Sequence, residues 1–313
     1  MRRVIFLLLT LLCISAGGEP SLLPGAGSGT PRVDRILLLD ATEAGSRIVA
    51  VGERGRILLS DDQGRSWRFA SSPTEATLTA VCFVGDRLGW AVGHDSTILL
   101  SRDGGDTWEQ VHVAPDQNAP LLDIWFADAD HGLAVGAYAL ALATADGGHT
   151  WNRIRLDDGD RHLNAIAGAG DGRLFVVGES GTIFRSDDRG RTWTKLEAPY
   201  QGSFFGALIL PNGSPLVFGL RGKVFVGSPE GVAWEAVESG TGSTLQGGRV
   251  TAQDEVLLVG NDGVILASRD GGKRFAALRT TDRKPIATVL PGDGPELLLF
   301  GEGGVSRFAR GAP

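Results

Sequence analysis

Short apolar runs alternate with glycine-rich polar turns along the chain, and the pattern repeats about every 41 residues. Each unit contains two or three apolar residues followed by a glycine. Seven such glycines stand 41, 43, 42, 41, 41 and 41 residues apart: Gly52, Gly93, Gly136, Gly178, Gly219, Gly260 and Gly301. In the first six units an aromatic residue follows 15 positions later: Trp67, Trp108, Trp151, Trp193, Trp234 and Phe275. Two landmarks that stay in phase over six units indicate a repeat architecture.

Each unit predicts four short strands. In the second unit, where the pattern is clearest, we expect strands at residues 78–83, 89–92, 97–101 and 107–111, separated by turns rich in Gly, Asp and Ser. Four strands in about 41 residues match one blade of a β-propeller. The sequence therefore predicts an all-β, seven-bladed β-propeller of four-stranded antiparallel blades. We place the blades at about residues 34–70, 77–113, 121–155, 163–197, 203–237, 245–278 and 286–309.

The last unit is shorter than the others. After Gly301 it contains one further apolar run, at residues 304–308, so its fourth strand is missing. A blade without that strand exposes an unpaired edge. We therefore expect N-terminal strand material, from around Thr30 to Leu39, to join the last blade and close the ring.

The first strand of each unit carries a residue at its third position that is small in most units. A narrow channel, on which the innermost strands converge, explains this preference. The residues in the second to seventh units are Ala80, Asp123, Ala165, Gly206, Gly247 and Thr288.

A second motif, Ser-x-Asp-x-Gly-x-Thr-Trp, lies between the third and fourth strands. It occupies residues 60–67 and recurs at 101–108, 144–151 and 186–193, with a looser copy at 268–275. The Asp can accept backbone N–H groups across the turn, the Gly supplies a positive φ, and the Trp can pack between neighbouring sheets. We interpret these residues as structural: Asp62, Asp103, Asp146, Asp188, Asp270, Trp67, Trp108, Trp151 and Trp193.

These turns resemble the BNR or Asp-box motif of sialidases and other propellers. Together with the seven units and the pattern WAVG…ILLSRDGGDTW, they make the chain similar to the photosystem II assembly-factor family of BNR propellers, over about residues 34–308. The resemblance implies a non-catalytic scaffold that needs no cofactor and binds a protein partner within a membrane-protein complex. In photosynthetic organisms that complex is photosystem II. Relatives in other bacteria imply an accessory role beside transporters of the resistance-nodulation-division (RND) type.

The alternative is a carbohydrate-active propeller, either a sialidase-like hydrolase or a lectin. A sialidase needs a tyrosine nucleophile and three arginines around a carboxylate, whereas this chain has only two tyrosines and lacks the Arg-Ile-Pro signature. The five histidines stand at different strand or turn positions of the units without ligand-type spacing, so we expect no metal site: His94, His112, His131, His149 and His162. We therefore predict that the protein is not an enzyme.

The N-terminus is typical of a secretory signal. Arg2 and Arg3 precede an apolar run at residues 4–12, and small residues follow. We predict a signal peptide at residues 1–17, a linker at 18–32 and the propeller at 33–313, in a monomer exported to the periplasm or, in a photosynthetic host, to the thylakoid lumen. Lipidation at Cys13 fits poorly because Leu12 precedes it, and Cys82 is expected to be buried and inert.

The remaining composition restricts the class of partner. The net charge is −7 and the isoelectric point is about 5.3, without a basic run, which disfavours nucleic acid. No apolar segment after the signal is long enough to span a bilayer. Tyrosine and arginine are favoured at interface centres, so we predict a partner-binding face on the turns and links between blades. Its candidate residues are Tyr138, Tyr200, Arg221, Arg279 and Arg283.

Overall fold

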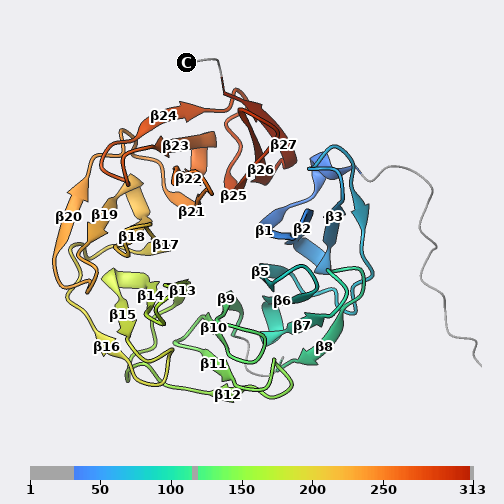
Figure 1. The fold of residues 1–313 in the computed structure, drawn as a ribbon, viewed down its shortest axis with the longest axis horizontal. Helices are drawn as coiled ribbons and strands as arrows, with labels where there is room; N and C mark the ends of the chain where they lie inside the picture. The colour runs from blue at the N-terminus through green and yellow to red at the C-terminus, as the bar shows by residue number, and fades with distance from the viewer. Residues whose placement is uncertain (1–31, 115–118, 311–313) are drawn as a thin grey trace, which may run out of the picture.

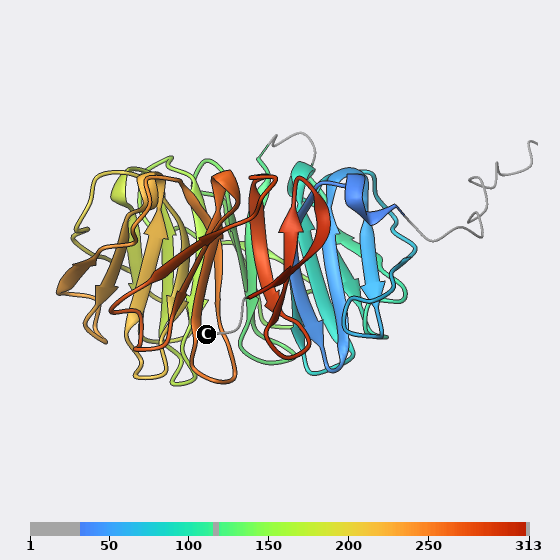
Figure 2. The same cartoon turned by 90° about the horizontal axis from the view of Figure 1, so that it is seen from above.

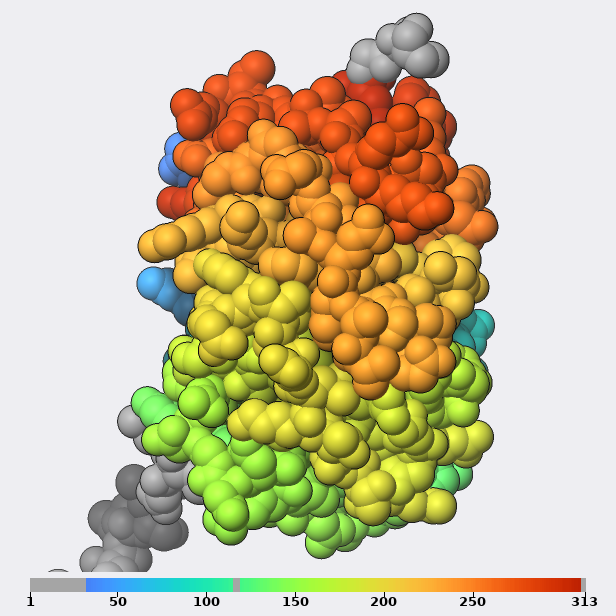
Figure 3. All heavy atoms as spheres, turned by 90° about the vertical axis from the view of Figure 1, so that its left-hand side faces the viewer, coloured from blue at the N-terminus to red at the C-terminus, as the bar shows by residue number. Residues whose placement is uncertain are grey.

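Seven antiparallel sheets stand around a central axis in the computed structural model, which describes residues 32–114 and 119–310 (Figure 1). The chain runs once around the circle, so the first and last sheets lie side by side. Seen from the edge, the strands run from one face of the disc to the other (Figure 2). From the side that carries β16 and β20, the side chains form a continuous outer surface from blade to blade (Figure 3). The predicted all-β, seven-bladed propeller is confirmed.

Each sheet is one blade, and its strands follow one another from the central axis outward. Blade 1 contains β1 (Leu38–Ala44), β2 (Arg47–Gly52), β3 (Ile57–Ser60) and β4 (Arg68–Phe69). Blade 2 contains β5 (Leu78–Val84), β6 (Leu88–Gly93), β7 (Ile98–Ser101) and β8 (Glu109–His112). Blade 3 contains β9 (Leu121–Phe126), β10 (Gly132–Gly136), β11 (Ala141–Thr144) and β12 (Asn152–Arg153). Blades 4 and 5 are β13 (Leu163–Gly168), β14 (Leu174–Gly178), β15 (Ile183–Ser186), β16 (Thr194–Lys195); β17 (Phe204–Ile209), β18 (Pro215–Gly219), β19 (Val224–Gly227), β20 (Trp234–Val237). Blades 6 and 7 are β21 (Leu245–Val250), β22 (Val256–Gly260), β23 (Val264–Ser268), β24 (Ala276–Arg279); β25 (Ile286–Pro291), β26 (Glu296–Gly301), β27 (Gly304–Ala309).

The second and third strands of the blades form the core. β2 and β3 are almost entirely buried, because each sheet packs on both sides against its neighbours. Continuous apolar runs such as Ile48–Val51 and Ile57–Leu59 satisfy that environment, whereas the outermost β4 is exposed. Between blades 1 and 2, for example, Val49 and Leu59 meet Leu99 and Trp108 in one apolar cluster. The core therefore lies between the blades rather than at one centre.

The second strand connects to the third through a short turn on one face of the disc, which we call the turn face. Five of the first six blades form a 3-10 turn there: η2 (Glu53–Gly55), η3 (His94–Ser96), η5 (Glu179–Gly181), η6 (Leu220–Gly222) and η7 (Asn261–Gly263). In η2 a Cβ on Gly55 would lie 1.9 Å from the carbonyl oxygen of Thr74, so the link to the next blade packs directly over this glycine. The turns and links therefore form one closely packed layer.

The hairpins with the Ser-x-Asp motif lie on the opposite face, the Asp-box face. In blade 2 the Asp103 carboxylate accepts hydrogen bonds from the backbone N–H of Thr107 (2.9 Å) and from its hydroxyl (2.6 Å). The Trp108 indole N–H donates to the Gly105 carbonyl at 2.9 Å, and its ring packs edge-on against Phe83. The other three complete copies of the motif repeat this indole bond, with Trp67, Trp151 and Trp193 donating to Gly64, Gly148 and Gly190.

Blade 7 has three strands, as its short sequence predicts. The N-terminal segment lies beside this blade, but within the described residues it forms a 3-10 turn, η1 (Val33–Arg35), that contacts β27 instead of pairing as a strand. The sequence of β27 explains why no fourth strand is needed. β27 exposes Ser306 and Arg307 at positions where the third strands of other blades, such as β3, carry buried apolar residues. A polar edge with a charged side chain tolerates solvent. Thr30, the start of the expected strand, lies outside the described residues.

Polar contacts also join blade 7 to blade 1. The Arg307 guanidinium donates to the Gln63 carbonyl at 2.9 Å, and Arg65 pairs with Asp293 at 2.6 Å.

No helix in the described residues is long and apolar enough to cross a membrane. The predicted signal peptide at residues 1–17, with Cys13, lies outside the described part of the chain.

Candidate functional site

The central residue of each turn on the turn face has a positive φ in the first six blades. These residues are Arg54, Asp95, Tyr138, Ser180, Arg221 and Asp262, with φ between 53° and 59°. Gly, Asn and Asp adopt this left-handed conformation most readily, whereas long and aromatic side chains are uncommon there. The turn itself therefore does not explain Arg54, Tyr138 or Arg221.

Tyr138 projects from the turn between β10 and β11 with 58% of its surface exposed. Its ring packs edge-on against His162 of blade 4, with 5.0 Å between ring centroids. The backbone N–H of His162 donates to the Glu179 carboxylate at 3.1 Å, and the imidazole Nδ1 lies 3.6 Å from the same carboxylate. An exposed tyrosine is thus supported by residues of the adjacent blade.

Tyr200 is half-buried in the link between blades 4 and 5. Its ring centroid lies 6.2 Å from those of Phe204 and Phe225, inside the apolar cluster between these blades. Its backbone oxygen would lie 2.3 Å from a Cβ on Gly181. Most of the Tyr200 ring therefore contributes to packing.

Arg279, at the end of β24, and Arg283, in the link after blade 6, approach one carboxylate. Their guanidinium groups lie 4.0 Å and 3.5 Å from Asp262. Arg279 also donates to the hydroxyl of Thr241 at 3.2 Å. Arg221, in η6 of blade 5, is exposed. Of the five residues that the sequence nominated, only Arg279 and Arg283 thus lie together, and the five do not form one cluster.

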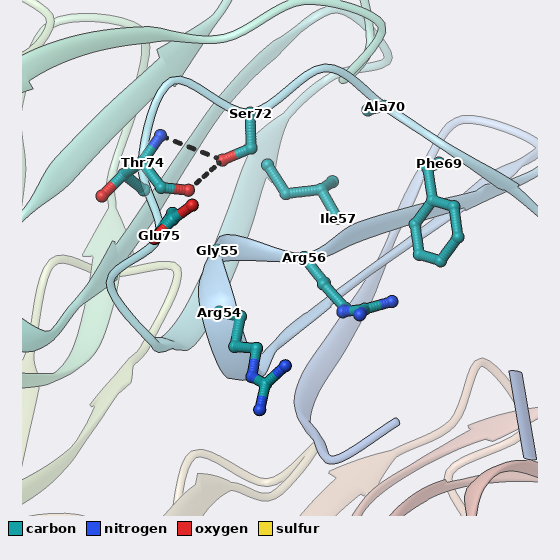
Figure 4. A pocket seen from close by; sticks show the side chains of 9 residues that line it. All are labelled: Arg54, Gly55, Arg56, Ile57, Phe69, Ala70, Ser72, Thr74 and Glu75. Carbon is teal, nitrogen blue, oxygen red and sulfur yellow. Dashed lines mark hydrogen bonds between the residues drawn. The ribbon is translucent and has the colours of Figure 1, made fainter. Parts of the chain in front are cut away.

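A pocket of about 590 Å³ opens on the turn face at the outer side of blade 1 (Figure 4). Its lining comes from η2, β3, β4 and the link to β5: Arg54, Gly55, Arg56, Ile57, Phe69, Ala70, Ser72, Thr74 and Glu75. The Arg56 guanidinium lies 5.4 Å from the centroid of the Phe69 ring. Ser72 donates its hydroxyl to the Thr74 carbonyl at 3.2 Å, which shapes the opposite wall. None of the residues predicted to bind a partner lines this pocket.

Two carboxylates, here called the channel carboxylates, stand on the innermost strands β1 and β9 at the position that is small in most blades. Asp40 accepts the backbone N–H of Val81 at 2.9 Å, and Asp123 accepts that of Ile166 at 2.7 Å, so each bridges to the next blade. Burial among the inner strands raises the pKa of Asp40 to about 6 and that of Asp123 to about 7, with the Asp40 charge adding to the second shift. Arg249 is the nearby cation, and burial lowers its pKa.

Cys82 lies near these two carboxylates. Burial raises the pKa of its thiol well above the ordinary value, and the charges of Asp123 and Asp40 add to that shift. A thiol in this environment is a poor nucleophile. Within residues 32–114 and 119–310, no group of three or more His, Cys, Asp and Glu side chains is placed to hold a metal ion.

Comparison with known proteins places the chain in a family. The family model described as "Photosynthesis system II assembly factor YCF48" matches residues 59–119 and 112–252, which is more than half of the chain. The photosystem II assembly protein Ycf48 of Thermosynechococcus vestitus is 32% identical over 255 residues, covering 76% of this chain and 73% of that protein. The chain belongs to the Ycf48 family. Its Ycf48 relative in Synechococcus sp. (strain JA-3-3Ab) is 39% identical over 177 residues, covering 54% of this chain and 52% of the relative.

Solved structures share the fold of this Ycf48-family propeller. A YCF48 bound to D1 peptide superposes with a TM-score of 0.71 at 18% identity, covering 88% of this chain and 93% of that one. The WD40 propeller of Doa1 gives the same TM-score at 12% identity, covering 90% and 94%. As a Ycf48-family member, the chain is an assembly-factor-like, non-catalytic propeller, which confirms the resemblance seen in its sequence.

Proposed function

We propose that this propeller is an exported assembly or accessory factor that docks a membrane-protein complex through its turn face. The observation that carries the proposal is the set of exposed side chains in left-handed turns, above all Tyr138 and Arg221, which the backbone disfavours. A family member has been solved with a D1 peptide, which supports a polypeptide as the ligand.

The Asp-box face is less suited to docking. Its aspartates accept hydrogen bonds within their own turns, and several of its arginines bridge neighbouring blades. Arg47, for example, pairs with Asp106 of blade 2 at 3.0 Å and donates to the Gly104 carbonyl at 3.1 Å. Groups already engaged in this way gain little from a partner, because a new contact would replace an existing one.

We place the protein in the periplasm, or in the thylakoid lumen of a photosynthetic host. The charged and apolar pattern at residues 1–17 supports this location. The family supports photosystem II as the complex in a photosynthetic host. In a host without photosystem II, we propose an RND-type transporter as the corresponding partner.

Affinity capture from native membranes tests the proposal. The bait is the full chain, and a turn-face variant that combines Tyr138→Asn with Arg221→Asn is compared with Arg189→Asn. Arg189 is an exposed arginine with φ of 60° on the Asp-box face, so its variant is a matched control. We expect wild type and control to recover the same membrane proteins, and the turn-face variant to lose them at an unchanged melting temperature.

The opposite pattern would contradict the proposal. If the turn-face variant captures the partner normally while Arg189→Asn loses it, docking uses the other face. Recovery of no membrane protein by any of the three baits, measured by quantitative mass spectrometry after cross-linking, would argue against a membrane-complex partner altogether.

A further inference from the structure

The repeated blades provide an internal comparison of what the fold requires at each position. Gly52 and Gly219 begin the equivalent turns of blades 1 and 5, so residues 167 apart occupy equivalent places. The counterparts of Arg54 are Asp95, Tyr138, Ser180, Arg221, Asp262 and Gly303. The counterparts of Arg56 are Thr97, Leu140, Thr182, Lys223, Val264 and Val305. Those of Phe69 in blades 2 to 6 are Gln110, Arg153, Lys195, Ala236 and Ala277.

Blade 1 alone combines two arginines with an aromatic ring at these three places. At the Arg56 position four other blades hold small or apolar residues that are at most 3% exposed: Thr97, Leu140, Thr182 and Val264. The backbone therefore accommodates a buried, uncharged residue where blade 1 has a half-buried arginine. Blade 5 has the two cations, Arg221 and Lys223, but Ala236 replaces the ring. The combination in blade 1 is thus not a requirement of the fold.

The two arginines of this pocket are not engaged in ion pairs. Within the described residues, neither Arg54 nor Arg56 has a carboxylate within 4.0 Å, although Glu53 and Glu75 lie close in sequence or in the lining. The link of blade 6 differs, because Arg279 and Arg283 there share Asp262. In Figure 4 the side chains of Arg54 and Arg56 extend to the same side of the pocket. Guanidinium groups so placed favour a carboxylate, which they can bind by charge-assisted hydrogen bonds.

The same pocket exposes an apolar surface. Phe69 is 43% exposed, one of the few large hydrophobic side chains with this exposure among the described residues. It lies beside Ala70 and Ile57 in the lining, and Arg56 covers part of its ring. A simple inorganic anion would leave this surface in water, whereas a ligand with an apolar side chain would cover it.

We propose that the blade 1 pocket binds a short polypeptide segment in which a carboxylate lies next to an apolar side chain. Arg54 and Arg56 hold the carboxylate, and Phe69 packs against the apolar side chain. This inference rests on the proposed function, because it names the chemistry of the partner at one place on the turn face. Ser72 and Thr74 give the far wall neutral polar character.

A nucleic acid fits the pocket less well than a peptide. The chain carries a net charge of −7, and Glu53 and Glu75 lie at or beside the pocket, so a polyanion meets repulsion around the two arginines. A single carboxylate next to an apolar group avoids that repulsion. The charge pattern therefore selects a peptide that is acidic at one position.

Selection from a library of random 12-residue peptides displayed on phage tests the proposal. The full chain is compared with a variant that combines Arg54→Asn and Arg56→Gln. Asn is favoured at a positive φ, so Arg54→Asn keeps or raises the melting temperature and separates binding from folding. Arg189→Asn, on the opposite face, is again the control. We expect wild type and control to enrich peptides with Asp or Glu beside Leu, Ile, Val or Phe, and the double variant not to.

Fluorescence anisotropy with the most enriched peptide then measures each contact. We expect a loss of about tenfold or more in affinity when its carboxylate is changed to the amide, and a similar loss for Arg54→Asn with Arg56→Gln. Phe69→Ala weakens the acidic and the amide peptide alike. Equal enrichment on wild type and double variant, enriched peptides without a carboxylate, or full competition by millimolar phosphate would each overturn the proposal. The double variant could also capture membrane proteins normally while wild type and double variant bind the acidic and amide peptides equally well. That result would contradict this inference and leave the proposed function unaffected.

Discussion

At the scale of single residues, the turn face contains two kinds of position. Some hold glycines that no other residue can replace, and others hold side chains that the backbone conformation disfavours. Gly55 has a φ of 65° and lies under the Thr74 carbonyl, so both conformation and space require the absence of a side chain. Its neighbour Arg54 also has a positive φ but points outward, where space is free. One residue of η2 thus serves the fold, and the next is available to a ligand.

Gly55→Ala tests the two requirements on this glycine. A positive φ alone costs an alanine about 1 kcal/mol, and the overlap with a backbone oxygen adds to it, so we expect a loss of about 3 kcal/mol in the free energy of unfolding. Gly85→Ala is the control, because Gly85 has a φ of 71° and a Cβ there would meet nothing within 4 Å. It should lose about 1 kcal/mol. Equal losses in urea unfolding would show that the contact with Thr74 is unimportant.

The sequence was informative wherever the repeat itself determines the structure. Two landmarks in phase were enough to predict the number of blades, the missing strand of blade 7 and the position of each Asp-box turn. These features could be predicted because they depend on local spacing. The blade 1 pocket was not predicted, since η2, β4 and the following link meet only in three dimensions. Position-by-position comparison of the units would have pointed to Arg54 and Arg56. The sequence showed a charged Asp123 among mostly small residues at its position, but the burial that raises its pKa depends on the packing of neighbouring blades.

At the scale of elements, the ring closes without a shared strand in its described part. β1 packs on β25 and β26, η1 contacts β27, and side-chain contacts between Arg307 and Gln63 and between Arg65 and Asp293 join the two blades. Other neighbouring blades are joined at their inner strands, where Thr79 donates to the Leu121 carbonyl and Asn164 to that of Phe204. Closure therefore depends on packing and on separate side-chain contacts such as those of Arg307 and Arg65.

Val33→Ser tests the contribution of η1 to closure. Val33 packs against the cluster between blades 1 and 7, together with Val305, so its loss should lower the free energy of unfolding by about 1 kcal/mol. Val113→Ser is the matched control, since Val113 is 48% exposed and should change stability by less than about 0.5 kcal/mol. Chemical unfolding followed by tryptophan fluorescence measures both. A Val33 variant as stable as the control would mean that η1 rests on the ring without supporting it.

At the scale of the whole molecule, two populations of carboxylates respond to pH in opposite directions. On the Asp-box face, hydrogen bonds from the hydroxyl and N–H of Ser66, Thr150 and Thr192 lower the pKa of Asp62, Asp146 and Asp188 to about 2. On the innermost strands, burial raises the pKa of the channel carboxylates Asp40 and Asp123 to about 6 and about 7. The outer turns thus favour ionised carboxylates, whereas the channel favours protonated ones.

These shifts set the sign of the pH dependence of stability. The Asp-box carboxylates bind protons more readily in the unfolded chain than in the folded one. Their contribution to the stability of the fold is therefore present above about pH 4 and is lost as the pH falls toward 2. The channel carboxylates bind protons more readily in the folded chain. Their contribution is therefore complete below about pH 4 and is lost as the pH rises to about 7. His112, whose pKa is lowered by burial, acts against the channel groups over part of this range.

Asp123→Asn separates the channel effect from the other titrations. Asn cannot ionise, and it keeps only one of the two oxygens that accept hydrogen bonds from Ile124 and Ile166, so the variant should be less stable than wild type at pH 5. Between pH 5 and 7.5, however, wild type should lose stability relative to the variant, because only wild type must ionise a carboxylate in the channel beside Asp40. Urea unfolding at a series of pH values measures the difference. Parallel curves for the two proteins would show that Asp123 titrates normally and that water solvates it as freely as a carboxylate on the outer surface.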